Sequence, residues 1–261
     1  RFSNGDKSND PKDVLPWGNE VSQTSMFGGD IQGIIDKLDY LKELGVDLLY
    51  LTPIFKSSSN HKYNTADYYE IDQQFGTVDK VKELVKKCHE RNIKIVFDAV
   101  FNHSGADFFA FEDILKNQEK SKYKDWYFID SFPVEFQKSN YYTFADDIPT
   151  MPKFNTANEE VKKYLLDVAK YWIDEVKIDG WRIDVCDEVD HSFWREFKKV
   201  VKRHKKEAII IGEIMHEASS FLKGDQLDGI MNYPFKGAMV DFFGNRTIDA
   251  KAFGEILSIN R

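Results

Sequence analysis

The stretch NIKIVFDAVFNH at residues 92–103 decides the fold, because a hydrophobic run ends there in a charged residue, Asp98. Two later segments have the same form: IDGWRID at 178–184, which ends at Asp184, and IIIGEI at 209–214, which contains Glu213. Nearly continuous hydrophobic runs are typical of strands buried on both faces, as in parallel sheets. In a parallel barrel the functional groups lie at the carboxyl ends of the strands.

Amphipathic helices are predicted between these strands. Apolar residues recur with helical spacing at 30–44, 78–92, 161–172 and 193–201. Strands are predicted at 46–54, 93–97, 178–185, 208–214 and 229–232. This alternation predicts an α/β fold of parallel βαβ units, either a barrel or a doubly wound sheet. No G-x-G-x-x-G or Walker motif follows a strand, which disfavours a nucleotide-binding fold.

One connection is far longer than the others. About 60 residues separate Asp98 from the helix that starts near Asn158, whereas βα loops usually have 2 to 6 residues. The segment is rich in aromatic and charged residues and is predicted to form a subdomain over one end of the barrel. We therefore predict three parts: a first barrel segment at 1–103, an inserted loop subdomain at 104–157 and a second, incomplete barrel segment at 158–261.

Composition excludes several classes of protein. The 261 residues carry 36 Lys and Arg against 44 Asp and Glu, a net charge of −8, which makes nucleic acid an improbable partner. No apolar run approaches the roughly 18 residues of a membrane span, so no membrane partner is expected. The two cysteines, Cys88 and Cys186, are predicted to be buried free thiols. Localisation stays open, because the chain begins at Arg1 rather than Met.

The charged strand ends allow two interpretations. In the simpler one, Asp98 and Arg182 form a structural salt bridge and the other acids are ordinary polar strand ends. In the other, Arg182 lowers the pKa of a neighbouring Asp, while Glu213 lies in a more apolar setting and stays protonated. A nucleophile and an acid of this kind suit cleavage of a glycosidic bond. A carboxyl separation of about 5 to 5.5 Å would give retention of anomeric configuration.

The residues at these strand ends resemble a known family. The segments 98–103, 180–184 and 212–214 are similar to three of the four short motifs of the alpha-amylase superfamily, glycoside hydrolase family 13. The stretch HKYNTADY at 61–68 resembles the loop of that family in which a tyrosine stacks on the sugar. The segment MPKFN at 151–155 is similar to MPKLN, which marks the neopullulanase, cyclomaltodextrinase and maltogenic amylase branch.

The resemblance implies a (β/α)8 TIM barrel with a loop subdomain after the third strand, acting on α-1,4 and in some members α-1,6 glucosidic bonds. Its substrates would be maltodextrins, cyclodextrins, pullulan or starch, with transglycosylation as a second outcome. It implies Asp184 as nucleophile, Glu213 as general acid/base, and His61, Tyr63, Asp98, His103 and Arg182 as substrate-binding residues. The alternative is a catalytically inactive barrel that binds a glucan or a partner protein.

A calcium site is also implied. The opening loop is rich in Asn and Asp, whose oxygens suit calcium, although their spacing alone is a weak signal. In the resembled branch the equivalent loop binds calcium together with a later Gly-Gly-Asp. The implied ligands are therefore Asn4, Asp6, Asn9, Asp10, the Gly28 carbonyl and Asp30.

The chain also departs from the family pattern. None of its six histidines is followed by Asp, so the fourth motif, which carries the third catalytic carboxylate, is missing. The segments that match the family's first strand and strands seven and eight are missing too, so we expect part of a longer catalytic domain that is inactive alone. Branch members often dimerise through an N-terminal domain, so the full-length protein is a candidate homodimer.

Overall fold

A single parallel sheet forms the centre of the computed structural model, which describes residues 2–22, 24–136 and 140–259. Its five strands are β1 (Leu48–Tyr50), β4 (Lys94–Ala99), β5 (Gly180–Ile183), β6 (Ile209–Ile214) and β7 (Gly229–Asn232), in that spatial order. All four neighbouring pairs are parallel. Five parallel strands in this order are what the sequence predicts for part of a (β/α)8 barrel.

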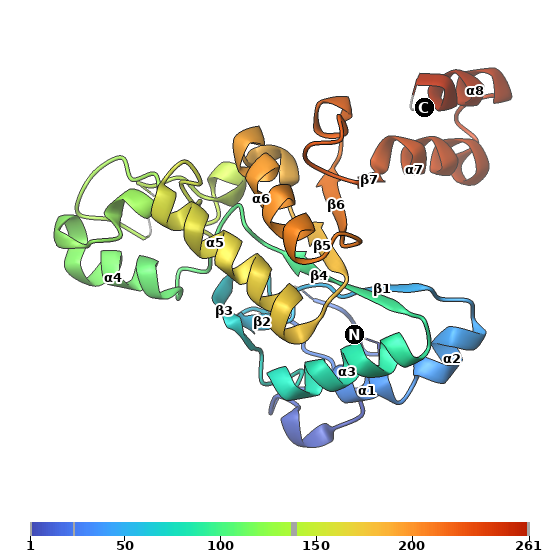
Figure 1. Ribbon diagram of the computed structural model, residues 1–261, viewed down its shortest axis with the longest axis horizontal. Coiled ribbons are helices and arrows are strands. Elements are labelled where there is room, and N and C mark those ends of the chain that lie inside the picture. Colours follow the sequence, from blue (N-terminus) through green and yellow to red (C-terminus); the bar gives the residue numbers. More distant parts are fainter. Residues whose placement is uncertain (1, 23, 137–139, 260–261) are drawn as a thin grey trace.

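Helices cover one face of this sheet (Figure 1). The longer ones are α3 (Val78–Glu90), α5 (Glu159–Tyr171) and α6 (His191–His204), each of which joins two strands of the sheet. The chain also contains α1 (Ile31–Ile35), α2 (Leu38–Glu43), α4 (Phe109–Asn117), α7 (Tyr233–Met239) and α8 (Ala250–Ile259). Short 3₁₀ segments lie at Lys7–Asn9, Gln118–Lys120, Lys124–Trp126, Phe144–Asp146, Cys186–Glu188 and Ser219–Phe221, and π-helical turns at Trp172–Val176 and Val240–Asn245.

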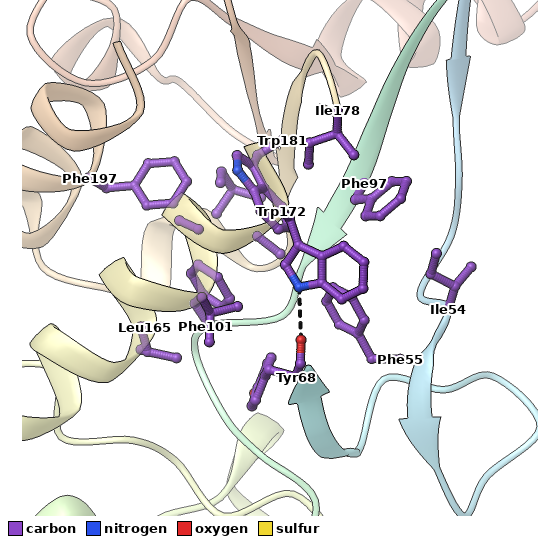
Figure 2. Packing of buried hydrophobic residues seen from close by; sticks show 14 of the residues in the cluster. Ile54, Phe55, Tyr68, Phe97, Phe101, Leu165, Trp172, Ile178, Trp181 and Phe197 are labelled. Carbon is purple, nitrogen blue, oxygen red and sulfur yellow. Dashed lines mark hydrogen bonds between the residues drawn. The ribbon is translucent and has the colours of Figure 1, made fainter. Parts of the chain in front are cut away.

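The core is unusually aromatic. Trp172, which follows α5, packs against Phe55 and Phe97, with ring centroids 5.0 and 5.5 Å apart, and its indole N–H donates to the carbonyl of Tyr68 at 2.8 Å (Figure 2). Such ring pairs add about 0.5–1.5 kcal/mol each beyond burial of their area. Both cysteines are buried and free, as predicted.

Two predicted elements differ from the observed ones. The helix expected at 30–44 is two helices, because Lys37 has non-helical angles (φ −110°, ψ 7°). The first buries Ile31 and Ile35, and the second buries Leu38 and Leu41. The strand expected at 46–54 extends only over β1. Among the described residues it pairs with β4 and is half-buried, and Pro53 beyond it has no amide to donate.

The sequence also did not predict a hairpin. Strands β2 (Phe55–Ser57) and β3 (Thr65–Ile71) form a separate antiparallel pair with irregular register. The loop between them contains residues 61–63. The inserted segment 104–157 contains α4 and lies at the opposite end of the molecule from α7 and α8 (Figure 1). No helix among the described residues is long and apolar enough to cross a membrane.

Candidate active site

The register of the sheet brings the predicted acids to one level. Asp98 on β4 is paired with Arg182 on β5, and Ile183 is paired with Gly212 on β6. Asp184 and Glu213 each follow by one residue, so both emerge at the carboxyl edge of the sheet. Side chains in a strand alternate between its faces. Four side chains therefore converge on one side of this edge: those of Asp98, Arg182, Asp184 and Glu213.

Arg182 bonds to all three acids. Its Nη1 donates to both oxygens of Asp98, each at 3.0 Å, and to Oδ1 of Asp184 at 2.8 Å. Its Nη2 lies 2.8 Å from Oε2 of Glu213. The side chains of Arg182, Asp98 and Asp184 are almost completely buried, and that of Glu213 is 14% exposed. One planar guanidinium thus fixes the relative positions of the three carboxyl groups.

A cavity of about 770 Å³ opens above this cluster. Six of the predicted catalytic and substrate-binding residues line it: His61, Tyr63, His103, Arg182, Asp184 and Glu213. Asp98 lies beneath, reached through Arg182. The inserted segment contributes Phe144, Ala145 and Met151 to the wall. The cavity combines apolar walls with a few polar groups and has the size typical of small-ligand sites.

Two tyrosines that sequence reasoning missed complete the polar floor. The hydroxyl of Tyr50, on β1, donates to Asp98, and the Tyr233 hydroxyl donates to Oε1 of Glu213 at 2.9 Å. Tyr233 directly follows β7, so the rule that strand ends carry function could have found it. Tyr50 had no such signal, because it lies inside an apparently hydrophobic strand.

The surroundings of Glu213 differ from the expected apolar setting. Its carboxyl group contacts Arg182 and Tyr233, and the backbone N–H of Val185 donates to it at 3.3 Å. The expectation of an apolar setting is therefore wrong. The surroundings of Glu213 are polar because Arg182, Val185 and Tyr233, on or next to the neighbouring strands, supply hydrogen-bond donors.

The electrostatics of Asp184 also differ from the expectation. Burial and the charge of Asp98 raise the pKa of Asp184 to about 8, although Arg182 acts to lower it. Burial likewise raises the pKa of Asp98 to about 6. The prediction that Arg182 keeps the neighbouring Asp pKa low is wrong, because one guanidinium cannot offset the burial of three carboxyl groups. The free site therefore favours holding a proton near neutral pH.

These shifts predict how stability depends on pH. A carboxyl group with a raised pKa binds more protons in the folded than in the unfolded chain, so the free energy of unfolding falls as pH rises between the two pKa values. For Asp98 and Asp184 this interval runs from about pH 4 to about pH 8. Asp184→Asn removes the larger of these two contributions to the pH dependence of stability. We expect its melting temperature relative to wild type to increase steadily from pH 5 to pH 8.

Thermal melts of both proteins across this range measure the effect. Asp187→Asn is the matched control, because Asp187 lines the same cavity but pairs with His216 rather than with Arg182. Parallel wild-type and Asp184→Asn curves would contradict the assignment of the raised pKa to Asp184.

His103 is neutral at physiological pH, because burial lowers its pKa to about 4. Its Nε2 lies 3.1 Å from the carbonyl of Tyr63, which can only accept, so Nε2 carries the proton. The rings of His61 and Tyr63 are stacked, with centroids 6.0 Å apart. These contacts join the loop between β2 and β3 to the end of β4, on one wall of the cavity.

The residues implied as calcium ligands lie around the N-terminal loop. Asn4 Nδ2 donates to both carboxylate oxygens of Asp10, at 3.0 and 2.8 Å, and a Cβ on Gly28 would lie 2.2 Å from that nitrogen. Asp30 accepts from the backbone amides of Gly5 and Asp6 at 3.1 and 2.7 Å. The Asp6 side chain turns instead to Ser8, whose hydrogen bonds lower its pKa.

The side chains of this loop offer oxygen ligands that suit calcium. The described part of the chain contains no cluster of three or more His, Cys, Asp or Glu placed to hold a metal. However, the amide oxygens Oδ1 of Asn4 and Asn9 are buried without a hydrogen-bond partner among the described residues. Buried polar atoms normally have partners, and hard oxygens of this kind are the ligands that calcium takes. The donor set therefore fits the ion.

Comparisons with known proteins agree with this geometry. Residues 1–258 match the family model "Alpha amylase, catalytic domain". The chain is 59% identical over 259 residues to a cyclomaltodextrinase of Thermoanaerobacter pseudethanolicus, covering 99% of this chain and 45% of that protein. It is 53% identical to neopullulanase 2 of Thermoactinomyces vulgaris, covering 97% and 44%.

A solved structure is similar as well. The cyclic alpha-maltosyl-(1→6)-maltose hydrolase from Arthrobacter globiformis, in complex with its cyclic sugar, superposes with a TM-score of 0.95 at 42% identity. That match covers 99% of this chain and 58% of the other. The chain thus spans less than half the length of the curated relatives named above.

Proposed function

The chain belongs to the alpha-amylase family, glycoside hydrolase family 13, in the cyclomaltodextrinase, neopullulanase and maltogenic amylase branch, and on that premise we propose that it carries the active site of a retaining α-glucan hydrolase. One observation supports this most strongly. Two carboxyl groups, Asp184 and Glu213, are bonded to the two ends of one buried guanidinium at the floor of a sugar-sized cavity. A pair of carboxyl groups facing one cavity is what glycoside hydrolysis requires.

The proposed reaction has two steps. Asp184 attacks the anomeric carbon while Glu213 protonates the leaving glycosidic oxygen, which breaks the bond and leaves a glycosyl ester on Asp184. Glu213 then takes a proton from water, whose oxygen attacks the same carbon and releases Asp184. The sugar leaves in its original α configuration. If a second sugar hydroxyl replaces water, the product is a longer glucan, which is transglycosylation.

Arg182 orients both reacting groups in this scheme. It holds Asp184 and Glu213 before substrate arrives, so little reorganisation is needed in the reaction. The scheme needs Asp184 ionised and Glu213 protonated, so the proton that burial favours on Asp98 and Asp184 in the free site has to lie on Glu213 when the substrate is bound. Developing positive charge on the sugar favours ionised Asp184 in the transition state.

The proposed substrates are maltodextrins, cyclodextrins, pullulan and starch, with α-1,4 and in part α-1,6 bonds cleaved. The names of the relatives support this range. Product analysis of the full-length protein on β-cyclodextrin, pullulan and starch tests it, with the anomeric form of new ends followed by NMR. We expect α-anomers from at least one substrate. Binding without any cleavage would favour an inactive glucan-binding barrel instead.

We also propose that the full-length protein is a homodimer. Light scattering of the full-length protein tests this.

We further propose that calcium stabilises the N-terminal loop, held by Asn4, Asn9, Asp10 and Asp30, with the Gly28 carbonyl and Asp6 as the remaining ligands. Binding to the folded state alone adds about 2.7 kcal/mol when calcium is one hundred times Kd. EDTA is therefore expected to lower the melting temperature of the full-length protein by several degrees, and added calcium to restore it.

Two variants sharpen the calcium test. Asn9→Ala removes a buried, unpartnered oxygen and is expected to abolish the calcium-dependent shift in melting temperature. Asp13→Ala, an exposed acid in the same loop, is expected to keep it. Equal shifts in both variants, or no response of wild type to EDTA, would refute the site.

A further inference from the structure

Lys62 is a buried lysine between two residues of the cavity wall. Its side chain is 1% exposed, whereas lysine is almost never fully buried in proteins. The residues on either side, His61 and Tyr63, both line the cavity, whereas the ammonium group of Lys62 pairs with Asp72. Its burial therefore needs another explanation.

The ammonium group of Lys62 is anchored behind the loop. Nζ lies 2.8 Å from Oδ2 of Asp72, donates to the carbonyl of Ser57 at 3.0 Å, and lies 6.0 Å from the centre of the Phe75 ring. Asp72, just after β3, also accepts from the backbone N–H of Ser57 at 3.2 Å. The ion pair thus connects the tip of the loop to both strands of the hairpin.

The backbone at Lys62 has a conformation that a lysine adopts rarely. Its φ is +67°, in the left-handed region, and it has a Cβ that this region disfavours. The turn is closed by two local bonds: Lys62 N–H donates to Ser59 Oγ at 3.0 Å, and Tyr63 N–H donates to His61 Nδ1 at 3.1 Å. The second bond holds His61 against Tyr63 and accounts for their stacked rings.

The position of Tyr63 affects the rest of the site. Its carbonyl accepts from His103 Nε2 at 3.1 Å, and its hydroxyl lies 3.4 Å from Oδ2 of Asp98. A shift of this turn would therefore move the ring that faces the sugar and also release His103. Strained turns persist only where surrounding structure holds them, and here the buried ion pair does so.

We propose that Lys62, through its ion pair with Asp72, is a positioning residue that sets the place of Tyr63 in the cavity wall. The inference rests on the proposed function, because its consequence is the rate of glucan cleavage. A buried ion pair is weak evidence for stability, since well-packed apolar residues often replace one without loss. Its value here is the fixed geometry of the turn.

The test is a double-mutant cycle in the full-length protein, assayed well below each melting temperature. Lys62→Met/Asp72→Asn removes both charges together, so that neither is left buried alone. We expect kcat/KM for β-cyclodextrin or maltodextrin to fall at least tenfold. In a Tyr63→Ala background the same pair of changes is expected to cause less than a threefold further loss, because the ring is already gone and only the bond from His103 to the backbone carbonyl of residue 63 is left to disturb.

Lys205→Met is the matched control. Lys205 also pairs with a buried Asp, with its Nζ 2.6 Å from Oδ1 of Asp179, but that pair lies at the opposite end of β5. We expect it to lower the melting temperature and to leave kcat/KM within twofold. This separates loss of stability from loss of positioning.

Two results would overturn the inference while leaving the proposed function intact. One is wild-type kcat/KM in Lys62→Met/Asp72→Asn. The other is an undiminished tenfold loss in the Tyr63→Ala background, which would show that Lys62 does not act through Tyr63. A wild-type protein without activity on any α-glucan would overturn the proposed function and this inference together.

Discussion

Asp184→Asn in the full-length protein is expected to lower kcat for maltodextrin hydrolysis by about 10⁴-fold or more. The amide keeps the shape of the side chain and can still accept from Arg182 Nη1, which lies 2.8 Å from Oδ1. It cannot act as the nucleophile that forms the glycosyl ester. Steady-state rates with a reducing-sugar assay measure the loss, and circular dichroism checks that the variant is folded.

Asp187→Asn is the matched control for this variant. Asp187 lines the same cavity, and its Oδ2 lies 2.7 Å from His216 Nε2, whereas Asp184 accepts from Arg182. We expect less than a tenfold loss of kcat in Asp187→Asn. Hydrolysis by Asp184→Asn at a rate close to wild type would remove the proposed mechanism.

Glu213→Gln is expected to lower kcat for maltodextrins by about 10²- to 10⁴-fold, the usual range for loss of general acid–base catalysis. The loss has a signature. A sugar with a fluoride leaving group needs no proton from an acid, so Glu213→Gln is expected to form the glycosyl ester from α-maltosyl fluoride at a rate near wild type. The released fluoride appears as a burst, because the second step still lacks its base.

The difference between Asp184→Asn and Glu213→Gln tests which residue is the nucleophile and which is the acid/base. Asp184→Asn is expected to release no fluoride burst, since its defect is the nucleophile. Glu188→Gln serves as the control, because Glu188 lines the cavity but bonds to Asn102 and Lys153 instead of to Arg182. A fluoride burst in Asp184→Asn, or none in Glu213→Gln, would reverse or refute the assignment.

Sequence reasoning predicted the parts of the fold that depend on short-range pattern. The hydrophobic runs at β4 and β5 are buried in the sheet as predicted, whereas β6 buries only every second residue. Asp98, Asp184 and Glu213 converge as predicted, because parallel strands in register bring their carboxyl ends to one edge. Strand β7, at 229–232, was also predicted correctly.

Features that depend on long-range contacts were not predictable in this way. β1 is shorter than expected because the ladder with β4 ends before Pro53, which has no amide to donate, and a hydrophobic pattern does not show where a ladder ends. The position of Tyr50 against Asp98 likewise depends on how β1 pairs with β4. The pKa of Asp184 was predicted in the wrong direction, because the sequence shows neither how deeply this side chain is buried nor the two further acids on the same guanidinium.

The most direct test of the account is covalent trapping of the intermediate. The full-length protein would be incubated with 5-fluoro-α-D-glucosyl fluoride, which forms the ester quickly and hydrolyses slowly, and then digested and analysed by mass spectrometry. We predict one fluorosugar per chain, attached to the peptide that contains Asp184 and absent from Asp184→Asn. A sugar attached to another residue, or products of inverted configuration with no labelled protein, would contradict the central claim.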